Sequence, residues 1–370
     1  MASTILIDRD EITAMVTLNK PETMNADASP SHRGLLQMKW DLRTFLPAAF
    51  VMVASLLSSL DANAQVKLRW AHVGTANAPQ TIYADEVAKL VKERTNGRVL
   101  IQVFPNSQLG GAGELVDGVK SGALSMGHHE FASLAKLLPI AAVFNTPFVY
   151  RDSAHSLRAT NESTSPALRE INQQLVKKDN VRVVGSFFAG TRHLTSNEKV
   201  LSSKDMQGKK YRGVPIKLWS SMLTGMGAIA TPVEVSELAT ALATGLVVGQ
   251  ENPLCNLQSL KLYEVQKFVM MTGHMQSTLA VFANEKVWQS IPAADRKIFE
   301  DTMAEVGKAT LNWDRDTTGK CRTDLEAKGM TFIEAKDGLD IEGFRKSVLA
   351  QVGKDFPDWP RYIDLIRAVK

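Results

Sequence analysis

Residues 208–253 read GKKYRGVPIKLWSSMLTGMGAIATPVEVSELATALATGLVVGQENP, and the order of elements in this stretch decides the fold class. Short apolar runs alternate in it with helical patterns, and Ser236 is the expected N-cap of one helix. The elements expected, in order, are a strand at 211–214, a helix at 217–223, a helix at 237–243 and a strand at 246–249. Strands that alternate with helices are typical of α/β proteins with largely parallel sheets.

The same alternation continues on both sides of this stretch. Strands are expected at 67–73, 98–104 and 181–188, the last of them ending in a turn at Gly190, and helices at 81–95, after Gly110-Gly111, and at 292–328. The roughly 300 residues from Gln65 onward are enough for two α/β lobes. Ligands of open α/β sheets bind beside the carboxyl ends of strands, so a cleft between two lobes is the expected binding place.

Residues 38–64 read MKWDLRTFLPAAFVMVASLLSSLDANA and have the pattern of a signal peptide. Lys39 and Arg43 precede an apolar run, and Ala62-Asn63-Ala64 supplies a small-residue cleavage site. A retained anchor is the alternative, but the run is shorter than the ~20 residues that span a bilayer. We therefore expect the protein to be exported to the periplasm.

The residues before Met38 do not belong to this pattern. The stretch ILIDRDEITAMVTLNKPETMNA at 5–26 resembles the opening strands of the enoyl-CoA hydratase (crotonase) family, and nothing later in the chain continues that resemblance. We expect residues 1–64 to be a non-native leader followed by the signal peptide, with Met38 as the initiator. An enzyme remains a rival class on this short resemblance alone.

Composition and motifs argue against several other functions. The net charge is +4 and the basic residues are scattered, so no nucleic-acid partner is expected. The chain has no nucleophile elbow, no phosphate-binding loop and no dinucleotide fingerprint, so neither enzymatic activity nor a cofactor is expected. His128-His129-Glu130 has metal-ligand residue types, but neighbours on an extended segment point to opposite sides, and no metal is expected there.

The two cysteines, Cys255 and Cys321, are not arranged as a C-x-x-C pair. An oxidising compartment would allow one disulfide between them. The spacing of a single pair does not decide the matter, and two separate buried thiols are the preferred interpretation.

The stretch 208–253 resembles the matching block of the periplasmic solute-binding proteins of tripartite ATP-independent periplasmic (TRAP) transporters, of the dicarboxylate-binding type. The matches within it are Arg212, Val214-Pro215, Gly227-Ala228, Thr231-Pro232, Ser236-Glu237, Ala241-Leu242, Thr244-Gly245 and Gly249-Gln250-Glu251-Asn252-Pro253. Further matches at 104–111, 141–150, 190–200 and 262–274 extend the resemblance from Lys67 to the C-terminus. The departures are Ala239 for the usual Tyr, Ala243 for Gln, Val248 for Asp, and the inserted Gly213.

The resemblance implies a set of ligand-binding residues. Arg212 matches the arginine that forms a two-pronged salt bridge with the solute's carboxylate, a role that suits the paired donors of a guanidinium. Arg192 matches an assisting arginine, and Asn252 matches an amide that bonds the solute from the other side of the cleft. His72 and Glu130 fall where some members contact the solute. Without the resemblance, Arg212 would be interpreted as a surface arginine, Arg192 as part of a structural ion pair and Asn252 as a turn residue. His72 and Glu130 would be interpreted as solvated loop residues.

Trp219 and Met222 follow Arg212 on the predicted helix and have two interpretations. They could form an apolar wall of the ligand pocket. Their spacing of three is equally that of a core-facing helix stripe, which is the preferred interpretation.

The resemblance also implies the architecture and the partners. The fold expected is the two-lobed periplasmic-binding-protein fold, with a ligand cleft between the lobes and long C-terminal helices. Lobe I would comprise 65–190 and 278–317, and lobe II 191–277 and 318–370. The partners expected are a small organic acid and the membrane subunits of a TRAP transporter; a binding protein that signals to a receptor is the alternative. The sequence leaves a dicarboxylate, a keto or hydroxy acid and an aromatic acid open.

Overall fold

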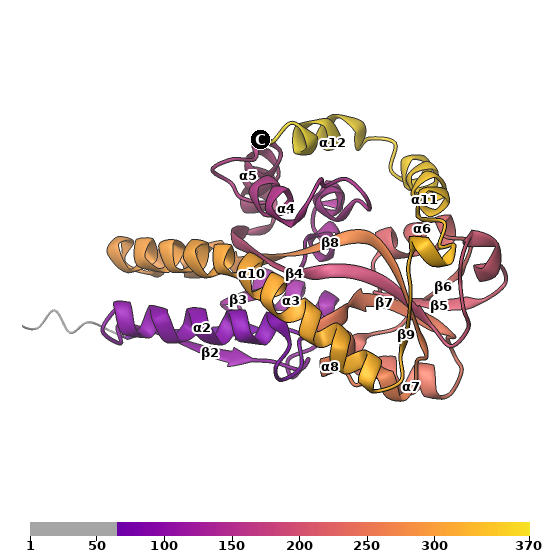
Figure 1. Ribbon diagram of the computed structural model, residues 1–370. Coiled ribbons are helices and arrows are strands. Elements are labelled where there is room, and N and C mark those ends of the chain that lie inside the picture. The colour runs from indigo at the N-terminus through magenta and orange to yellow at the C-terminus, as the bar shows by residue number, and fades with distance from the viewer. Residues whose placement is uncertain (1–64) are drawn as a thin grey trace, which may run out of the picture. The chain divides into compact units, whose positions relative to one another are not determined.

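Two long antiparallel strands, β4 (Val181–Ser196) and β8 (Phe268–Asn284), run through the centre of the fold in a computed structural model that describes residues 65–370. They belong to a mixed sheet with the strand order β2-β1-β3-β8-β4-β7-β5-β6, and β9 also pairs with β8 (Figure 1). The shorter strands are β1 (Val66–Ala71), β2 (Val99–Phe104), β3 (Met126–Glu130), β5 (Lys210–Gly213), β6 (Ile229–Pro232), β7 (Gly249–Pro253) and β9 (Thr331–Ile333).

Each long strand supports different partners along its two halves. Strand β3 pairs with residues 279–283 of β8, whereas β7 pairs with residues 192–196 of β4 and β9 with residues 268–270 of β8. The pairing of β4 with β8 changes register between Phe188 and Thr191 and again between Arg192 and Leu194. The two ends of the sheet are therefore joined at an irregular stretch of β4, and Arg192 lies within it.

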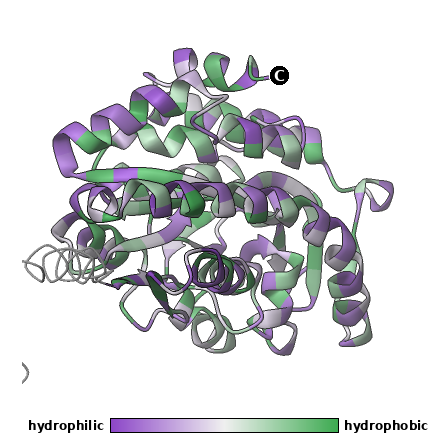
Figure 2. Cartoon of the chain, turned by 90° about the vertical axis from the view of Figure 1, so that its left-hand side faces the viewer, coloured by the Kyte–Doolittle hydropathy of each residue, from purple (hydrophilic) through white to green (hydrophobic). Residues whose placement is uncertain are grey.

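Helices cover the sheet and bury one face each. They are α2 (Pro79–Arg94), α3 (Ala112–Ser121), α4 (Ser153–Ala159), α5 (Pro166–Asp179), α6 (Lys217–Gly225), α7 (Leu238–Ala243), α8 (Leu254–Ser259), α9 (Glu285–Ser290), α10 (Ala293–Ala327), α11 (Ile341–Asp355) and α12 (Pro360–Arg367). Hydrophilic and hydrophobic residues stripe these helices, as expected for helices with one buried face (Figure 2). The 3₁₀ segments Phe131–Lys136 (η1) and Pro139–Asn145 (η2) follow β3.

The predicted long helix is α10, which spans 35 residues and contacts α2, β4 and α8 (Figure 1). Its close approach to β4 requires a glycine, because a Cβ at Gly307 would lie 2.7 Å from the carbonyl oxygen of Ser186. The α/β fold class with long C-terminal helices is confirmed. The division into two lobes at the predicted boundaries stays a prediction. By their contacts, the described residues form one compact unit.

Two predictions about the sheet differ from the structure. The sheet is mixed rather than largely parallel, since the β4–β8, β3–β8 and β4–β7 pairs are antiparallel. Strand β4 does not end in a turn at Gly190 but continues to Ser196; Gly190 keeps a positive φ of 118° within the strand. Residues 190–196 of β4, GTRHLTS, are mostly polar and lack the apolar alternation that marks a strand in sequence, although most of them are buried.

Two smaller shifts occur in the 208–253 stretch. The strand expected at 246–249 is β7, displaced to Gly249–Pro253, because its buried residues are mostly polar and the apolar run precedes it. Ser236 lies in a 3₁₀ turn at Val235–Glu237. The N-cap of α7 is Glu237 and not Ser236.

Two predictions concern residues outside the described part of the chain. The signal peptide at 38–64 and the leader before it cannot be compared with the structure, which begins at Gln65. Within residues 65–370, no helix combines the length and the apolarity that a membrane crossing needs.

The interpretation of the cysteines as separate thiols was wrong. Cys255 on α8 and Cys321 on α10 form a disulfide with their Cα atoms 5.2 Å apart. The two residues are 66 positions apart in the sequence and meet because α8 packs against α10, a contact that no local pattern encodes. The disulfide thereby ties α8 to the long helix.

We expect the double variant Cys255→Ala/Cys321→Ala to lower the free energy of unfolding by about 2–4 kcal/mol, because the bond closes a long loop in the unfolded chain. Urea unfolding of the oxidised wild type and of the variant measures this difference. Ser290→Ala, at an exposed position, is the control that should leave the midpoint unchanged. Equal midpoints for wild type and double variant would contradict the prediction.

Candidate functional site

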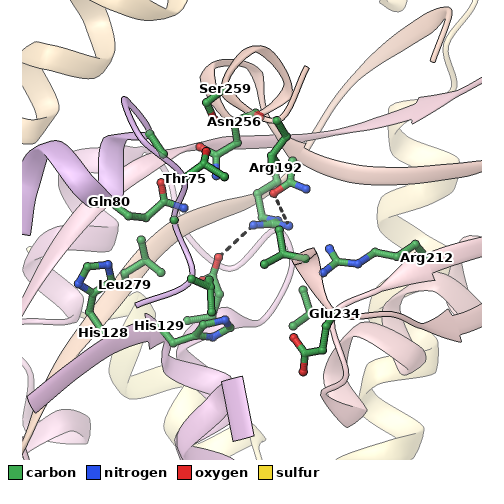
Figure 3. Close-up of a pocket in the computed structure, with 18 residues that line it drawn as sticks. Thr75, Gln80, His128, His129, Arg192, Arg212, Glu234, Asn256, Ser259 and Leu279 are labelled. Carbon is green, nitrogen blue, oxygen red and sulfur yellow. Dashed lines mark hydrogen bonds and ion pairs between the residues drawn. The ribbon is translucent and has the colours of Figure 1, made fainter. Parts of the chain in front are cut away.

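A cavity opens where the irregular stretch of β4 meets the ends of β3, β7 and α8 (Figure 3). It encloses about 620 Å³ of atom-free space, part of it open to solvent. The loop after β1 contributes Thr75 and the start of α2 contributes Gln80, while β3 contributes His128, His129 and Glu130. The other polar residues of the lining are Arg192, Arg212, Glu234, Asn252, Asn256 and Ser259, and apolar side chains such as Val214 and Leu279 lie between them.

Arg212, on β5, is a buried arginine without a carboxylate partner. Its side chain is 2% exposed, and its Nε donates to the carbonyl oxygen of Val233 at 2.8 Å. No described residue forms an ion pair with it, so both terminal nitrogens remain available. Burial, together with the charge of Arg192, lowers the pKa of Arg212 to about 10 against the opposing charges of Glu251 and Glu234. The group is still charged at neutral pH, and a buried charge without a partner is costly unless an anion compensates it.

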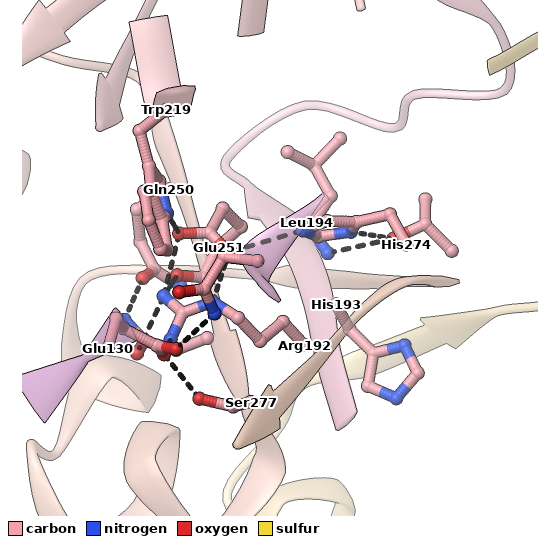
Figure 4. Close-up of polar contacts among 12 residues, drawn as sticks. Glu130, Arg192, His193, Leu194, Trp219, Gln250, Glu251, His274 and Ser277 are labelled. Carbon is pink, nitrogen blue, oxygen red and sulfur yellow. Dashed lines mark hydrogen bonds and ion pairs between the residues drawn. The ribbon is translucent and has the colours of Figure 1, made fainter. Parts of the chain in front are cut away.

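Arg192, on β4, differs from Arg212 because each nitrogen of its guanidinium donates to a carboxylate of the protein. Its Nε and Nη2 bond the two carboxylate oxygens of Glu251 at 2.5 and 2.7 Å. Its Nη1 bonds Glu130 at 3.1 Å, and its Nη2 also contacts the side-chain oxygen of Asn252 at 3.2 Å. The arginine is therefore neutralised by two carboxylates of the protein itself (Figure 4).

Glu251, on β7, accepts hydrogen bonds from three directions. Besides Arg192, the indole Nε1 of Trp219 donates to it at 2.8 Å, and His274 Nε2 lies 3.1 Å from it. Burial alone would raise the pKa of Glu251, but the charge of Arg192 and the hydrogen bonds from Arg192 and His274 lower it to about 2. Glu251 therefore remains ionised inside the fold.

Glu130, at the end of β3, is the second acceptor of the cluster. Its carboxylate also accepts from the amide of Asn145 at 2.7 Å and from the hydroxyl of Ser277. Burial raises the pKa of Glu130, and the Arg192 charge opposes the rise. These hydrogen bonds hold the carboxylate of Glu130 in place in the cavity wall.

The histidines of the cavity wall are neutral. Trp70 donates its indole N–H to Nδ1 of His128 at 3.0 Å, and His72 stacks on His128 with ring centroids 4.4 Å apart. Burial lowers the pKa of His128 well below its ordinary value and that of His72 to about 4. Burial and the charges of Arg192 and Arg212 lower the pKa of His129 to about 3.

The structure places four of the six predicted site residues around the cavity. They are Arg212, Arg192, Asn252 and Glu130. His72 and Trp219 are not lining residues: His72 lies behind His128, and Trp219 is fully buried and bonds Glu251. The preferred interpretation of Trp219 as a core residue agrees with this burial.

Sequence reasoning missed several residues of the site. Glu251 and Glu234 were not singled out, nor were Gln80, Thr75 and Asn256. A glutamate between Gln250 and Asn252 in a strand buried on both faces was the available signal for Glu251. The other residues sit on loops and helix starts, where no spacing rule marks them.

No group of three or more histidine, cysteine or acidic side chains among residues 65–370 is arranged to hold a metal ion. His128, His129 and Glu130 do line one cavity, but Glu130 is already bonded to Arg192, Asn145 and Ser277.

Comparison with known proteins places the chain in a family. Residues 70–354 match the model of the bacterial extracellular solute-binding proteins, family 7. A solute-binding protein of Roseobacter denitrificans is 31% identical over 310 residues, covering 83% of this chain and 94% of that protein. The crystal structure of that TRAP periplasmic solute-binding protein, with bound L-galactonate, matches with a TM-score of 0.75 at 26% identity, covering 82% of this chain and 98% of the other.

A second solved structure gives the same picture. A TRAP periplasmic solute-binding protein from Polaromonas, bound to D-erythronate, matches with a TM-score of 0.76 at 26% identity, covering 83% of this chain and 99% of that one. The fold, the cavity and these matches define a periplasmic-type solute-binding protein, which is not an enzyme. The chain belongs to family 7 of the bacterial extracellular solute-binding proteins, the binding proteins of TRAP transporters.

We expect Glu251→Gln to lower the free energy of unfolding by about 3–5 kcal/mol, because it leaves the buried Arg192 short of one of its two counter-charges. Chemical unfolding measures the loss. The matched control is Asp301→Asn, which breaks the exposed Lys297–Asp301 pair and should cause no measurable change. A loss no larger than that of the control would show that the buried pair does not stabilise the fold.

The lowered pKa of Glu251 predicts a pH dependence of the same pair. The folded-state value is about 2 against an ordinary 4.5, so the stabilising contribution is complete above pH 4.5 and is lost as the pH falls toward 2. The difference in unfolding free energy between wild type and Glu251→Gln should therefore shrink over that range. Unfolding curves at several pH values test this, and a constant difference would contradict it.

Proposed function

We propose that this chain captures a small organic acid by holding its carboxylate on Arg212, and that it then delivers the acid to the membrane subunits of a TRAP transporter. The observation that carries the proposal is the pair of arginines in one cavity, of which only Arg192 is neutralised by the protein. A guanidinium with two available nitrogens matches the two oxygens of a carboxylate. A bound carboxylate would supply the counter-charge that Arg212 lacks.

The known relatives support a carboxylate ligand. The solved structures from Roseobacter denitrificans and Polaromonas hold L-galactonate and D-erythronate, both of which carry one carboxylate. Asn252 and Glu130 line the same cavity and would supply further polar contacts to the solute. Arg192 would act indirectly, by holding Glu251, Glu130 and Asn252 in place.

Delivery requires that the protein be exported and that it change shape on binding. Export would use the signal peptide at residues 38–64. Closure would take place about the irregular stretch of β4, where the two ends of the sheet are joined. A ligand favours the closed state only through contacts that are better there than in the open state, and an anion held by Arg212 and by residues of the opposite wall is such a contact.

We expect Arg212→Ala to weaken binding of organic acids by about 2–5 kcal/mol, and Arg212→Lys to restore little, because lysine lacks the paired donors. The full chain would be unfolded and refolded to remove co-purified ligand, and its melting temperature recorded with a panel of organic acids. Arg367→Ala, at an exposed position on α12, is the matched control. If no acid stabilises the folded protein, or if Arg212→Ala responds as wild type does, the carboxylate clamp is wrong.

The delivery step has its own test. The gene of the protein would be deleted in its host and replaced by wild type or by Arg212→Ala, and uptake of the identified acid measured. Wild type should restore uptake and Arg212→Ala should not. Uptake that does not depend on the protein at all would contradict the transport role.

A further inference from the structure

Resting on the proposed function, we infer the class of acid that the cavity selects: a monocarboxylate whose carbon chain carries hydroxyl groups, bound with its carboxylate on Arg212 and its hydroxyls on Thr75, Gln80, His128 and Asn256. Dicarboxylates of the same length are bound more weakly. Two independent observations carry this inference, namely the charges around the cavity and the buried polar atoms that have no protein partner.

The charges leave room for one anionic group. Arg192 and Arg212 are the two cations of the lining, and Arg192 already pairs with Glu130 and Glu251. Glu234 is a further carboxylate of the lining. Arg212 forms no ion pair within the protein and can hold one ligand carboxylate, whereas a second carboxylate would meet only neutral groups and the carboxylates of the wall, which already outnumber the arginines by three to two. Like charges at short range in a buried site repel strongly.

The histidines of the lining do not supply a positive charge that could pair with a second carboxylate of the ligand. His128 is 1% exposed and His129 6% exposed, and burial holds the pKa of each far below neutrality. Arg192 and Arg212 lower the pKa of His129 further. Both side chains therefore face the cavity as neutral hydrogen-bonding groups.

The unpartnered polar atoms gather at this cavity. Nine buried side-chain polar atoms in the described residues have no hydrogen-bond partner, and five of them belong to its lining: Thr75 Oγ1, Gln80 Oε1, His128 Nε2, His129 Nδ1 and Asn256 Oδ1. Buried polar groups are almost always bonded, so such a concentration marks the place where a ligand supplies the partners. Gln80 and His128 lie on the opposite side of the cavity from Arg212 (Figure 3).

The chemistry of these groups matches hydroxyls rather than a second carboxylate. Nδ1 of His128 accepts from Trp70, so in the neutral ring Nε2 carries the proton and is a donor. The amides of Gln80 and Asn256 each present both a donor and an acceptor. A hydroxyl both donates and accepts, whereas a carboxylate only accepts and would leave the acceptor oxygens without a partner.

The test compares pairs of acids that differ at one carbon. Calorimetric titration of the ligand-free full chain would use D-erythronate against meso-tartrate and L-galactonate against galactarate, in which a terminal hydroxymethyl group becomes a carboxylate. In each pair whose monocarboxylate binds, we expect that monocarboxylate to bind about tenfold or more tightly than its dicarboxylate. A dicarboxylate that binds as tightly as its partner would overturn the inference.

Failure of this inference is distinguishable from failure of the proposed function. Acids without hydroxyls, such as butyrate and succinate, would be titrated in parallel with wild type and with Arg212→Ala. If these bind in an Arg212-dependent manner and the hydroxylated acids bind no better, the hydroxyl class is wrong and the carboxylate clamp stands. If no acid binds in an Arg212-dependent manner, both fail.

A substitution separates a hydroxyl contact from a structural role. Gln80→Leu should weaken the favoured hydroxylated acid about tenfold and leave the affinity for butyrate unchanged, because it removes only a hydrogen-bonding group. Asn256→Leu provides a second variant for the same comparison. Gln173→Leu, at an exposed position on α5, is the matched control. Equal losses for both acids in both variants would remove these residues from the proposed contacts.

Discussion

The buried ion pair between Arg192 and Glu251 is the interaction on which the rest of the site depends. Arg192 lies on β4 and Glu251 on β7, and Glu130 brings β3 into the same cluster (Figure 4). Trp219 from α6 and His274 from β8 complete the shell around Glu251. Burying such charges is costly, and the geometry offsets the cost only because almost every donor and acceptor is bonded. The cluster joins strands from both ends of the sheet at the place where the pairing of β4 is irregular.

This arrangement gives different roles to the two arginines of the cavity. Arg192 is committed to the protein's own carboxylates, so it fixes the shape of the wall and contributes little net charge to the cavity. Arg212 has one backbone partner and no carboxylate, so it retains its charge for a ligand. An anion bound there would pair with the Arg212 guanidinium in the folded protein only, which links ligand binding to stability through the same group.

Much of the fold could be predicted from the sequence, because its helices and outer strands show regular apolar patterns. Helix α10 matches its predicted range to within a residue at each end. The errors gather where buried residues are polar: the second half of β4 and strand β7 carry Arg192, His193, Glu251 and Asn252, which break the alternation that marks a strand. The Cys255–Cys321 bond was missed for a different reason, since it depends on the packing of α8 against α10. For the site, resemblance indicated Arg212 and Arg192, but only the packing shows that one is paired and the other is not.

A second set of polar residues, which line the cavity and have no hydrogen-bond partner in the protein, explains how such a cavity can discriminate among solutes. When a solute displaces water from the cavity wall, each buried donor or acceptor that the solute does not bond is left without a partner, which costs free energy. A solute that lacks matching groups leaves that cost in place, while a matching solute removes it, so rejection is built into the wall itself. In the proposed mode of binding, Arg212 would select for a carboxylate by charge, and the polar groups without protein partners would select among carboxylates by hydrogen bonding. Affinity and selectivity would then reside on different residues of one cavity, so substitution of Gln80 or Asn256 would change the solute preference without disturbing the charged cluster around Arg192 and Glu251.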